Sequence, residues 1–132
     1  MNKINLSCSV EGINGSIMYP SWKDILLRIQ KTKELGGSMY LSIIDGPDFG
    51  PVSLEIRGEN GYYLMTLLDN ITEGDDEVRS YDNLEIDSMQ PKIEILGDYW
   101  PMKMLTCDFT LVTSVCREFY ETGDVSQEIL SV

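Results

Sequence analysis

The densest group of side chains that could bind a metal or transfer protons is the acidic run Glu73-Gly74-Asp75-Asp76-Glu77. A calcium loop needs acids in an alternating D-x-D-x-D-G register with a Glu closing a loop of about 12 residues, and this run lacks that register. Two carboxylates can hydrolyse glycosides, but only when a cleft holds them at a fixed separation. We interpret the run as an exposed loop, and keep a calcium-binding module or a small sugar-active enzyme as alternatives.

Other catalytic groups are missing from the chain or are not arranged for catalysis. The sequence has no His, which excludes Ser-His-Asp and Cys-His mechanisms and His-ligated metals. The glycines of Gly46-Pro47-Asp48-Phe49-Gly50 lack the spacing and the Lys of a phosphate-binding loop, and predict a turn. The cysteines Cys8, Cys107 and Cys116 form no C-x-x-C pair, and we expect them to be buried thiols. We therefore predict a protein that is not an enzyme and has no cofactor or metal.

Charge gives the chain its clearest chemical character. The 22 Asp and Glu face 10 Lys and Arg, for a net charge of −12. Residues 45–98 alone hold 14 acids against three bases, a net charge of −11, whereas residues 1–44 hold five bases against three acids. Such a surface repels phosphates and anionic lipids, so nucleic acid and membrane are not expected as direct partners. A basic protein is the expected partner.

Aromatic residues accompany the acids in this half of the chain. Gly97-Asp98-Tyr99-Trp100-Pro101 predicts a turn that places an acid beside two residue types that often anchor interfaces. Tyr62, Tyr63 and Tyr81 also lie between the acids, and we expect some of them on the solvent-facing side of a sheet, where acid mixed with Tyr suits Arg and Lys. The predicted partner-binding residues are Glu55, Glu59, Tyr63, Glu73, Asp75, Asp76, Glu77, Asp82, Asp98 and Tyr99.

Two helices are predicted by their caps and by apolar residues at helical spacing. The first covers about residues 21–35, where Ser21 and Asp24 form a capping box and Gly36-Gly37 ends the helix. The second covers about 109–122, with Asp108 as its cap and Thr122-Gly123 at its end.

The rest of the chain predicts strands and turns. Alternation over residues 3–10 indicates a half-buried strand, and glycines at 12 and 15 indicate turns. Asn60-Gly61 predicts a tight hairpin turn. Further strands are expected at 39–44, 52–57, 62–68, 78–87, 91–96 and 102–107, with a loop at 69–77. We predict one α+β domain over residues 1–132, with a mainly antiparallel sheet of five to seven strands, two packed helices and a solvent-facing sheet surface. The amino-terminal residues lack the apolar run of a signal peptide, so a cytoplasmic protein is expected.

The segment Arg117-Glu118-Phe119-Tyr120-Glu121-Thr122-Gly123-Asp124 resembles the closing helix, with its E-F-x-x-T-G motif, of a family of bacterial immunity proteins. These proteins neutralise polymorphic toxins, including those of contact-dependent growth inhibition. The helix begun by Ser21-Trp22 and the segments 52–56 and 58–64 agree with the family's order of elements. The resemblance spans about residues 20–128.

The resemblance implies an α+β fold and a cytosolic protein that binds one cognate toxin domain, commonly a nuclease, without catalytic residues. A nuclease must be basic to hold phosphates, so an acidic inhibitor can approach it with an association rate constant of about 10⁸ M⁻¹s⁻¹ at low salt. The sequence thus predicts an immunity protein that blocks the active site or substrate groove of a basic toxin. The alternative is a DNA mimic that antagonises a nucleic-acid-binding protein.

Overall fold

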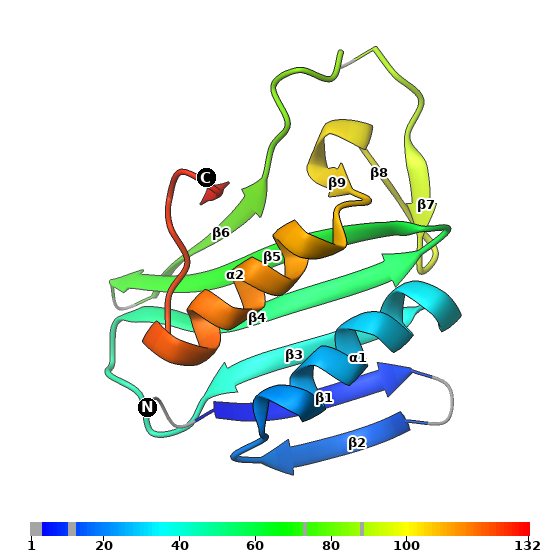
Figure 1. The fold of residues 1–132 in the computed structure, drawn as a ribbon. Helices are drawn as coiled ribbons and strands as arrows, with labels where there is room; N and C mark the ends of the chain where they lie inside the picture. The colour runs from blue at the N-terminus through cyan, green and yellow to red at the C-terminus, as the bar shows by residue number, and fades with distance from the viewer. Residues whose placement is uncertain (1–3, 11–12, 73, 88) are drawn as a thin grey trace.

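The computed structural model describes residues 4–10, 13–72, 74–87 and 89–132. Figure 1 shows the two helices lying side by side across one face of a broad sheet. The elements are β1 (Ile4–Val10), β2 (Ile13–Met18), α1 (Trp22–Leu35), β3 (Gly37–Ile43), β4 (Gly50–Glu59), β5 (Tyr62–Thr72), β6 (Asp75–Tyr81), β7 (Ile93–Ile95), β8 (Asp98–Trp100), the 3₁₀ turn η1 (Met102–Met104), β9 (Leu105–Thr106), α2 (Phe109–Thr122) and β10 (Leu130–Ser131).

The main sheet has eight strands in the order β10-β6-β5-β4-β3-β1-β2, with β9 paired to β5. Every pairing between these strands is antiparallel. A separate pair, β7 and β8, forms a short second sheet. The predicted α+β fold with an antiparallel sheet and two helices is therefore confirmed, and the main sheet has one strand more than the five to seven expected.

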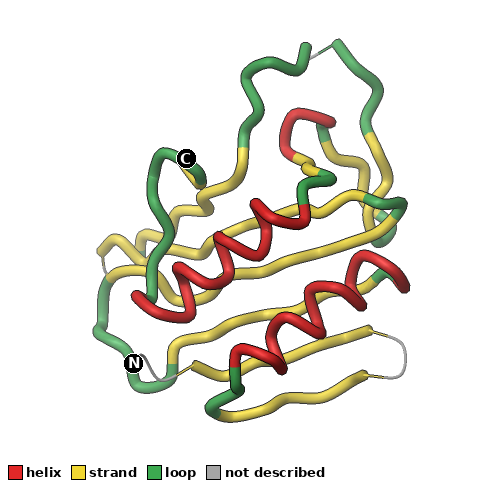
Figure 2. The backbone as a smooth tube through the Cα atoms, in the orientation of Figure 1, coloured by secondary structure: helices red, strands yellow, loops and turns green. Residues whose placement is uncertain are grey.

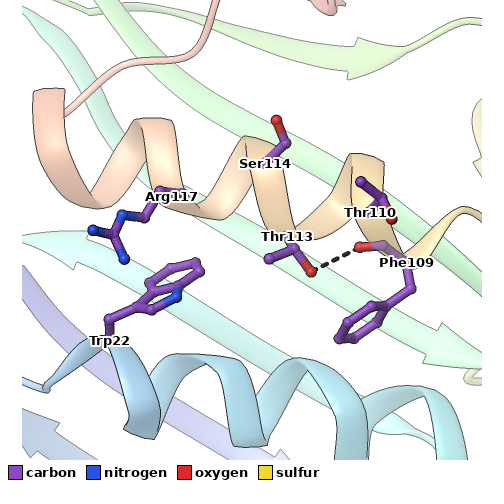
Figure 3. A pocket seen from close by; sticks show the side chains of 6 residues that line it. All are labelled: Trp22, Phe109, Thr110, Thr113, Ser114 and Arg117. Atoms are coloured by element: carbon purple, nitrogen blue, oxygen red, sulfur yellow. Dashed lines mark hydrogen bonds between the residues drawn. The ribbon is translucent and has the colours of Figure 1, made fainter.

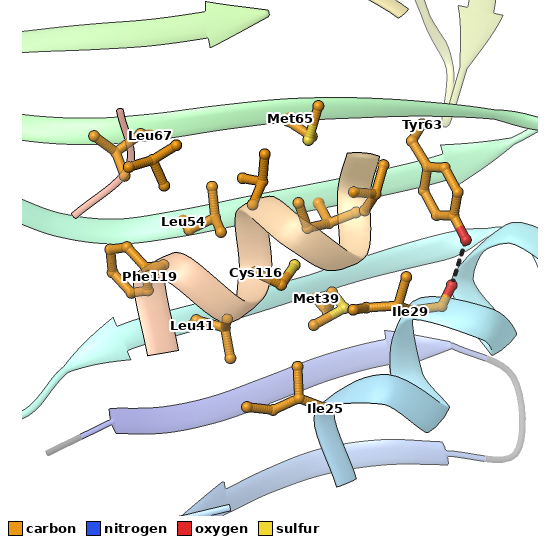
Figure 4. Packing of buried hydrophobic residues seen from close by; sticks show 14 of the residues in the cluster. Ile25, Ile29, Met39, Leu41, Leu54, Tyr63, Met65, Leu67, Cys116 and Phe119 are labelled. Atoms are coloured by element: carbon orange, nitrogen blue, oxygen red, sulfur yellow. Dashed lines mark hydrogen bonds between the residues drawn. The ribbon is translucent and has the colours of Figure 1, made fainter. Parts of the chain in front are cut away.

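The principal core lies between the two helices and the sheet, as Figure 4 shows. Apolar residues of alternate strand positions meet residues such as Ile29 of α1 and Phe119 of α2, all of them inaccessible to solvent. Tyr63 spans this layer, and its hydroxyl donates a hydrogen bond to the Ile29 carbonyl at 2.8 Å. Because side chains alternate along a strand, the residues between these core positions point to the opposite side of the sheet, which we call the open face.

A smaller core covers one end of the open face. Leu64 alternates with core residues of β5, so it points to the open face, where it is buried against Ile95 and Leu105. These contacts come from residues 82–106, which we call the lobe. Figure 2 shows that the lobe begins with a long loop before its first strand. The lobe leaves the middle of the open face uncovered.

The helix ends follow the predicted capping chemistry. The Ser21 hydroxyl accepts a hydrogen bond from the Asp24 amide at 3.2 Å, and the Asp24 carboxylate accepts one from the Ser21 amide at 2.9 Å. These bonds lower the pKa of Asp24, chiefly through the Ser21 amide. In α2 the Asp108 carboxylate accepts from the Leu111 amide at 3.2 Å, and Gly123 ends the helix at a left-handed φ of 79°.

The strands predicted over 78–87 and 102–107 are shorter in the structure, since β6 ends at Tyr81 and η1 occupies Met102–Met104. Three segments predicted as turns or as a loop, in contrast, form strands. Asn14-Gly15, predicted as a turn, lies inside β2. The predicted loop 69–77 is mostly strand, because β5 extends to Thr72 and β6 begins at Asp75. Asp98 to Trp100, predicted as a turn, forms β8. In each case antiparallel pairing with a neighbouring strand satisfies the backbone, which outweighs the local preference of Asn, Gly and Asp for turns.

The two cysteines whose side chains the structure describes differ in exposure. Cys116 is buried as expected, but Cys107 is exposed, because it sits in the two-residue link between β9 and α2. The side chain of Cys8 lies outside the described part of the structure.

Neither α1 nor α2 is long and apolar enough to cross a membrane, and no other described segment forms such a helix.

Candidate functional site: the open face of the sheet

A depression of about 210 Å³ lies in the uncovered middle of the open face. The register of the strands explains its lining. Glu55 of β4 lies between Tyr40 of β3 and Thr66 of β5 in one row of paired residues. In the next row Ser53 pairs with Leu68, and Leu68 pairs with Val78 of β6. The residues that line the depression are Tyr40, Ser53, Glu55, Thr66, Leu68 and Val78.

Among the residues that the structure describes, Glu55 is the only acid that lines this depression, and its side chain is only 14% exposed. It accepts a hydrogen bond from Arg57 Nε at 2.9 Å and one from Thr66 Oγ1 at 3.5 Å. Hydrogen bonding to Glu55 is also the main cause that raises the pKa of Tyr40, followed by burial of the Tyr40 phenol. A carboxylate is thus held in a defined position by side chains of three strands.

Apolar side chains flank this carboxylate. Val78 is 57% exposed and Tyr40 is 39% exposed, although Val and Tyr are residue types that often lie in a core. Leu68 lies beside Val78 and is half-buried. Exposed apolar groups around a partly buried charge are typical of the centre of a protein interface, where a few anchors provide most of the binding energy.

Arg57 connects the depression to the lobe. Its guanidinium lies 5.8 Å from the centre of the Trp100 ring, and its Nη1 lies 3.9 Å from the Asp98 carboxylate. The Glu55 carboxylate is the largest cause that raises the pKa of Arg57. Tyr99, next to these residues in β8, is 65% exposed. The lobe thereby forms one border of the open face.

Acids gather at the opposite end of the strands, which we call the acidic end: Asp45 and Asp48 lie in the loop before β4, and Asp75 and Asp76 lie at the start of β6. The loop before β4 and the hairpin of β5 and β6 lie side by side because Gly50 pairs with Asn70, and Asn70 Nδ2 donates to the Asp48 carbonyl at 3.0 Å. All four acids are exposed. None of them forms an ion pair with another residue that the structure describes.

The predicted partner-binding residues therefore fall into separate groups. Asp75, Asp76 and Glu77 lie on β6 near the acidic end, and Glu55 lies in the depression. The residues Glu59, Asp82, Asp98 and Tyr99 lie at or beside the lobe, where Glu59 accepts from the Leu96 amide at 2.9 Å and Asp82 lies 4.0 Å from Lys103. The two ends of β4 are about 30 Å apart, since a strand advances about 3.3 Å per residue. Glu73 lies outside the described residues.

Tyr63 requires a correction. It was expected at the partner-binding surface, but its side chain is fully buried in the principal core. Burial, followed by the nearby Cys116 and Glu34, raises its pKa well above the usual range. The hairpin register decides this, because Tyr63 pairs with Gly58, whose position faces the helices. Tyr40, which the sequence reasoning missed, is the tyrosine that lines the depression on the open face. Its alternation with the apolar Met39 and Leu41 was the available signal.

The loop at the start of the lobe adds exposed apolar groups that were also missed. Leu84 is 87% exposed and Met89 is 86% exposed, and Asp82, Glu85 and Asp87 lie between or beside them. An acidic loop with exposed apolar side chains can contact a basic surface that has apolar hollows. The alternating acidic and apolar residues of 82–87 were the sequence signal.

A second hollow lies on the other side of the molecule, between α1 and α2. Figure 3 shows it, with Arg117 reaching over Trp22. It measures about 440 Å³, and the guanidinium of Arg117 lies 4.8 Å from the centre of the Trp22 ring. Phe109 and Thr113 line its other end. Arg117 also bonds the Glu121 carboxylate, so the charge in this groove is already paired.

Two reactive features concern the described acids and the buried thiol. Among the described residues, no three His, Cys, Asp or Glu side chains come together as a possible metal site. Burial raises the pKa of the Cys116 thiol far above neutral pH, so this thiol stays protonated there.

Comparisons with known proteins identify a family but no activity. A family model described as a family of unknown function, DUF6911, matches residues 4–129. The crystal structure of a hypothetical protein from Neisseria gonorrhoeae has a similar fold, with a TM-score of 0.74 and 22% identity over 95% of this chain and 91% of that one. No curated protein matches the sequence. The chain therefore belongs to the DUF6911 family.

Proposed function

We propose that this protein is a cytoplasmic immunity protein, which binds a basic toxin domain, such as a nuclease, and blocks its active site or substrate groove. The open face, with the acidic end at one border and the lobe at the other, is the proposed contact surface. The resemblance of the closing helix to that of immunity proteins supports the class of function. The charge distribution on the fold supports the kind of partner.

The observation that carries the proposal is the concentration of exposed acids at the acidic end, which no ion pair with a described residue neutralises. Helix α1, on the opposite side of the sheet, holds Lys23, Arg28, Lys31 and Lys33 against only Asp24 and Glu34. The acidic end holds four exposed acids without an ion pair among the described residues. An unneutralised field on one side steers a basic partner toward that side and increases the association rate.

Charge alone does not hold a complex together, because exposed ion pairs contribute at most about 1 kcal/mol each. Tight binding needs desolvated anchors. The open face offers Tyr40 and Val78, and the lobe offers Tyr99, all of them exposed. We therefore propose that the acidic end speeds association of the partner and that these apolar groups slow its dissociation.

The test is co-expression of this chain with basic toxin domains, beginning with any that a neighbouring gene encodes, followed by measurement of cell survival and of binding kinetics. We expect rescue by the wild-type chain. Changing Asp45, Asp48, Asp75 and Asp76 together to Asn should slow association about tenfold or more at low salt and flatten its salt dependence.

A matched control removes four acids elsewhere, by changing Glu34, Glu118, Glu121 and Glu128 to Gln. This control has the same net charge but keeps the acidic end, so its association should slow much less. Absence of rescue by abundant, folded protein would contradict the immunity function. Equal binding to several unrelated DNA-binding proteins, with displacement of their DNA, would instead support a DNA mimic.

A further inference from the structure

The depression on the open face has the features of a pocket for one side chain. Its floor carries the Glu55 carboxylate, and its volume of about 210 Å³ is too small for a peptide segment or a folded element. The side chain of Glu55 is only 14% exposed, so its charge acts in a region of reduced solvent screening. A buried charge is costly to maintain unless a partner compensates it.

Arg57 pairs with the charge of this carboxylate, but the acceptor positions of the carboxylate are only partly filled. A carboxylate offers about four acceptor positions. Arg57 Nε occupies one at 2.9 Å, and Thr66 Oγ1 lies at the long distance of 3.5 Å. The rest of the Arg57 guanidinium points toward Trp100 and Asp98 in the lobe. Acceptor capacity therefore remains on the side that faces the depression.

The walls of the depression fit the stem of a long cationic side chain. Leu68 and Val78 form an adjacent apolar pair, and Tyr40 presents an aromatic ring on the other side of Glu55. The aliphatic part of Arg or Lys packs on apolar groups, while its charged head reaches an acceptor. A guanidinium additionally stacks on an aromatic ring and matches a carboxylate with two parallel hydrogen bonds.

We propose that this depression binds a single arginine side chain of the partner protein, with Glu55 accepting its guanidinium and Tyr40, Leu68 and Val78 enclosing its stem. This inference deepens the proposed function and rests on it for the identity of the partner. Arginine is favoured over lysine because the Tyr40 ring and the carboxylate together select a flat, bidentate group. The other described residues that line the depression, Ser53 and Thr66 among them, carry no charge, so Glu55 is its charged acceptor.

The first experiment needs no toxin. Nα-acetyl-arginine amide is titrated into the full chain labelled with ¹⁵N, and amide shifts are followed by NMR. We expect saturable shifts at Thr66, Leu68 and Val78 with a Kd of about 1–10 mM, a weak affinity normal for one side chain. Nα-acetyl-citrulline amide, which has the same shape without the charge, should bind at least about tenfold more weakly.

Variants locate the effect. Glu55→Gln should abolish the shifts, while Glu34→Gln, on α1, should leave them unchanged. Leu68→Phe, which fills the depression without changing charge, should also abolish them, so the result does not depend on one variant's folding. Equal binding of the citrulline and arginine amides, or shifts that persist in Glu55→Gln, would overturn the proposal. Stronger binding of the lysine amide would overturn the choice of arginine.

The second experiment separates this inference from the proposed function. With the toxin bound, Glu55→Gln should raise the dissociation rate about 30-fold or more and change association little, because a desolvated pair acts on dissociation. If the toxin bound wild type and Glu55→Gln equally, the arginine pocket would be wrong and the immunity function would stand. If no basic toxin bound but the arginine amide did, the pocket would stand and the immunity function would be wrong.

Discussion

The guanidinium of Arg79 lies 2.9 Å from the carboxylate of Asp124, the residue that follows the end of α2. Arg79 is 2% exposed and also donates to the carbonyls of Leu130, at 3.0 Å, and Val125. A second carboxylate, Asp69 of β5, lies 3.4 Å away. A buried cation in β6 thus holds the chain that follows α2 against the sheet, which brings β10 to its edge.

Replacing Arg79 should destabilise the fold strongly. We expect Arg79→Met to lower the free energy of unfolding by about 3–5 kcal/mol, because two carbonyls and two carboxylates lose their common donor. Arg79→Lys keeps the charge but not the fork of donors, so it should restore only part of this loss. Urea unfolding gives the values. Lys31→Met, at an exposed ion pair with Glu34, is the control and should change stability by less than about 0.5 kcal/mol.

Tyr63 should make stability decrease at alkaline pH. Its pKa is raised by burial, so the folded protein keeps the phenol proton at a pH where the unfolded chain, with a Tyr pKa of about 10, has lost it. The corresponding stability is complete below about pH 10 and is lost as the pH rises above that value. Tyr63→Phe should lower stability by about 1 kcal/mol at pH 7, through loss of the bond to Ile29, and should make the alkaline decrease less steep.

The measurement is urea unfolding at several pH values between 7 and 11 for both proteins. Tyr99→Phe changes an exposed phenol and should leave the pH profile as in wild type. Because Tyr40 and Cys116 also have raised pKa values, part of the alkaline decrease should remain in Tyr63→Phe. Parallel profiles for wild type and Tyr63→Phe would contradict the assignment to Tyr63.

Adding a single methyl group at Gly58 should destabilise the fold. A Cβ at this position would lie 2.7 Å from the Thr32 carbonyl oxygen and 2.9 Å from Thr32 Cγ2, so α1 would have to move away from β4. We expect Gly58→Ala to cost about 1–3 kcal/mol of stability. Gly61→Ala offers a contrast, since its Cβ would meet no atom within 4 Å, and only the positive φ of 82° opposes it. Its cost should be about 1–2 kcal/mol.

The two described thiols should differ in reactivity. Cys107 is exposed and Cys116 is buried, so iodoacetamide should modify Cys107 in the folded protein and reach Cys116 only after unfolding. Peptide mapping by mass spectrometry after native and denaturing treatment measures both sites separately. Modification of Cys116 under native conditions at the rate of Cys107 would show that the packing of α2 on the sheet is wrong.

The parts of the fold that sequence reasoning found are those in which neighbours along the chain decide the conformation. The capping box of Ser21 and Asp24 marks the start of α1, and the hydrogen bonds are present. Asn60 and Gly61 have φ values of 55° and 82°, so the predicted hairpin turn is confirmed. Each of these signals depends on contacts within about four residues, which a sequence displays directly.

The incorrect predictions concern segments whose conformation depends on residues far away in the sequence. The acids of 69–77 repel one another locally. The backbone pairing of Asp69 with Glu77 and of Thr72 with Asp75 nevertheless extends the hairpin, and Arg79 forms an ion pair with Asp69. Likewise, Tyr62 and Tyr63 look alike in sequence. Only the register with β4 places Tyr63 in the core, because a shift by one residue would exchange the two faces.

The candidate site shows the same division. Composition alone determined that the protein is strongly acidic, lacks His, and concentrates its negative charge between residues 45 and 98. The tertiary structure decided that Glu55, Tyr40 and Val78, from three strands, share one depression, while the other described acids of the predicted binding set lie toward the two ends of the sheet. Charge belongs to single residues and capping depends on near neighbours, so neither depends on the tertiary fold. Adjacency across strands follows from pairing of segments far apart in sequence, so it exists only once the sheet has formed.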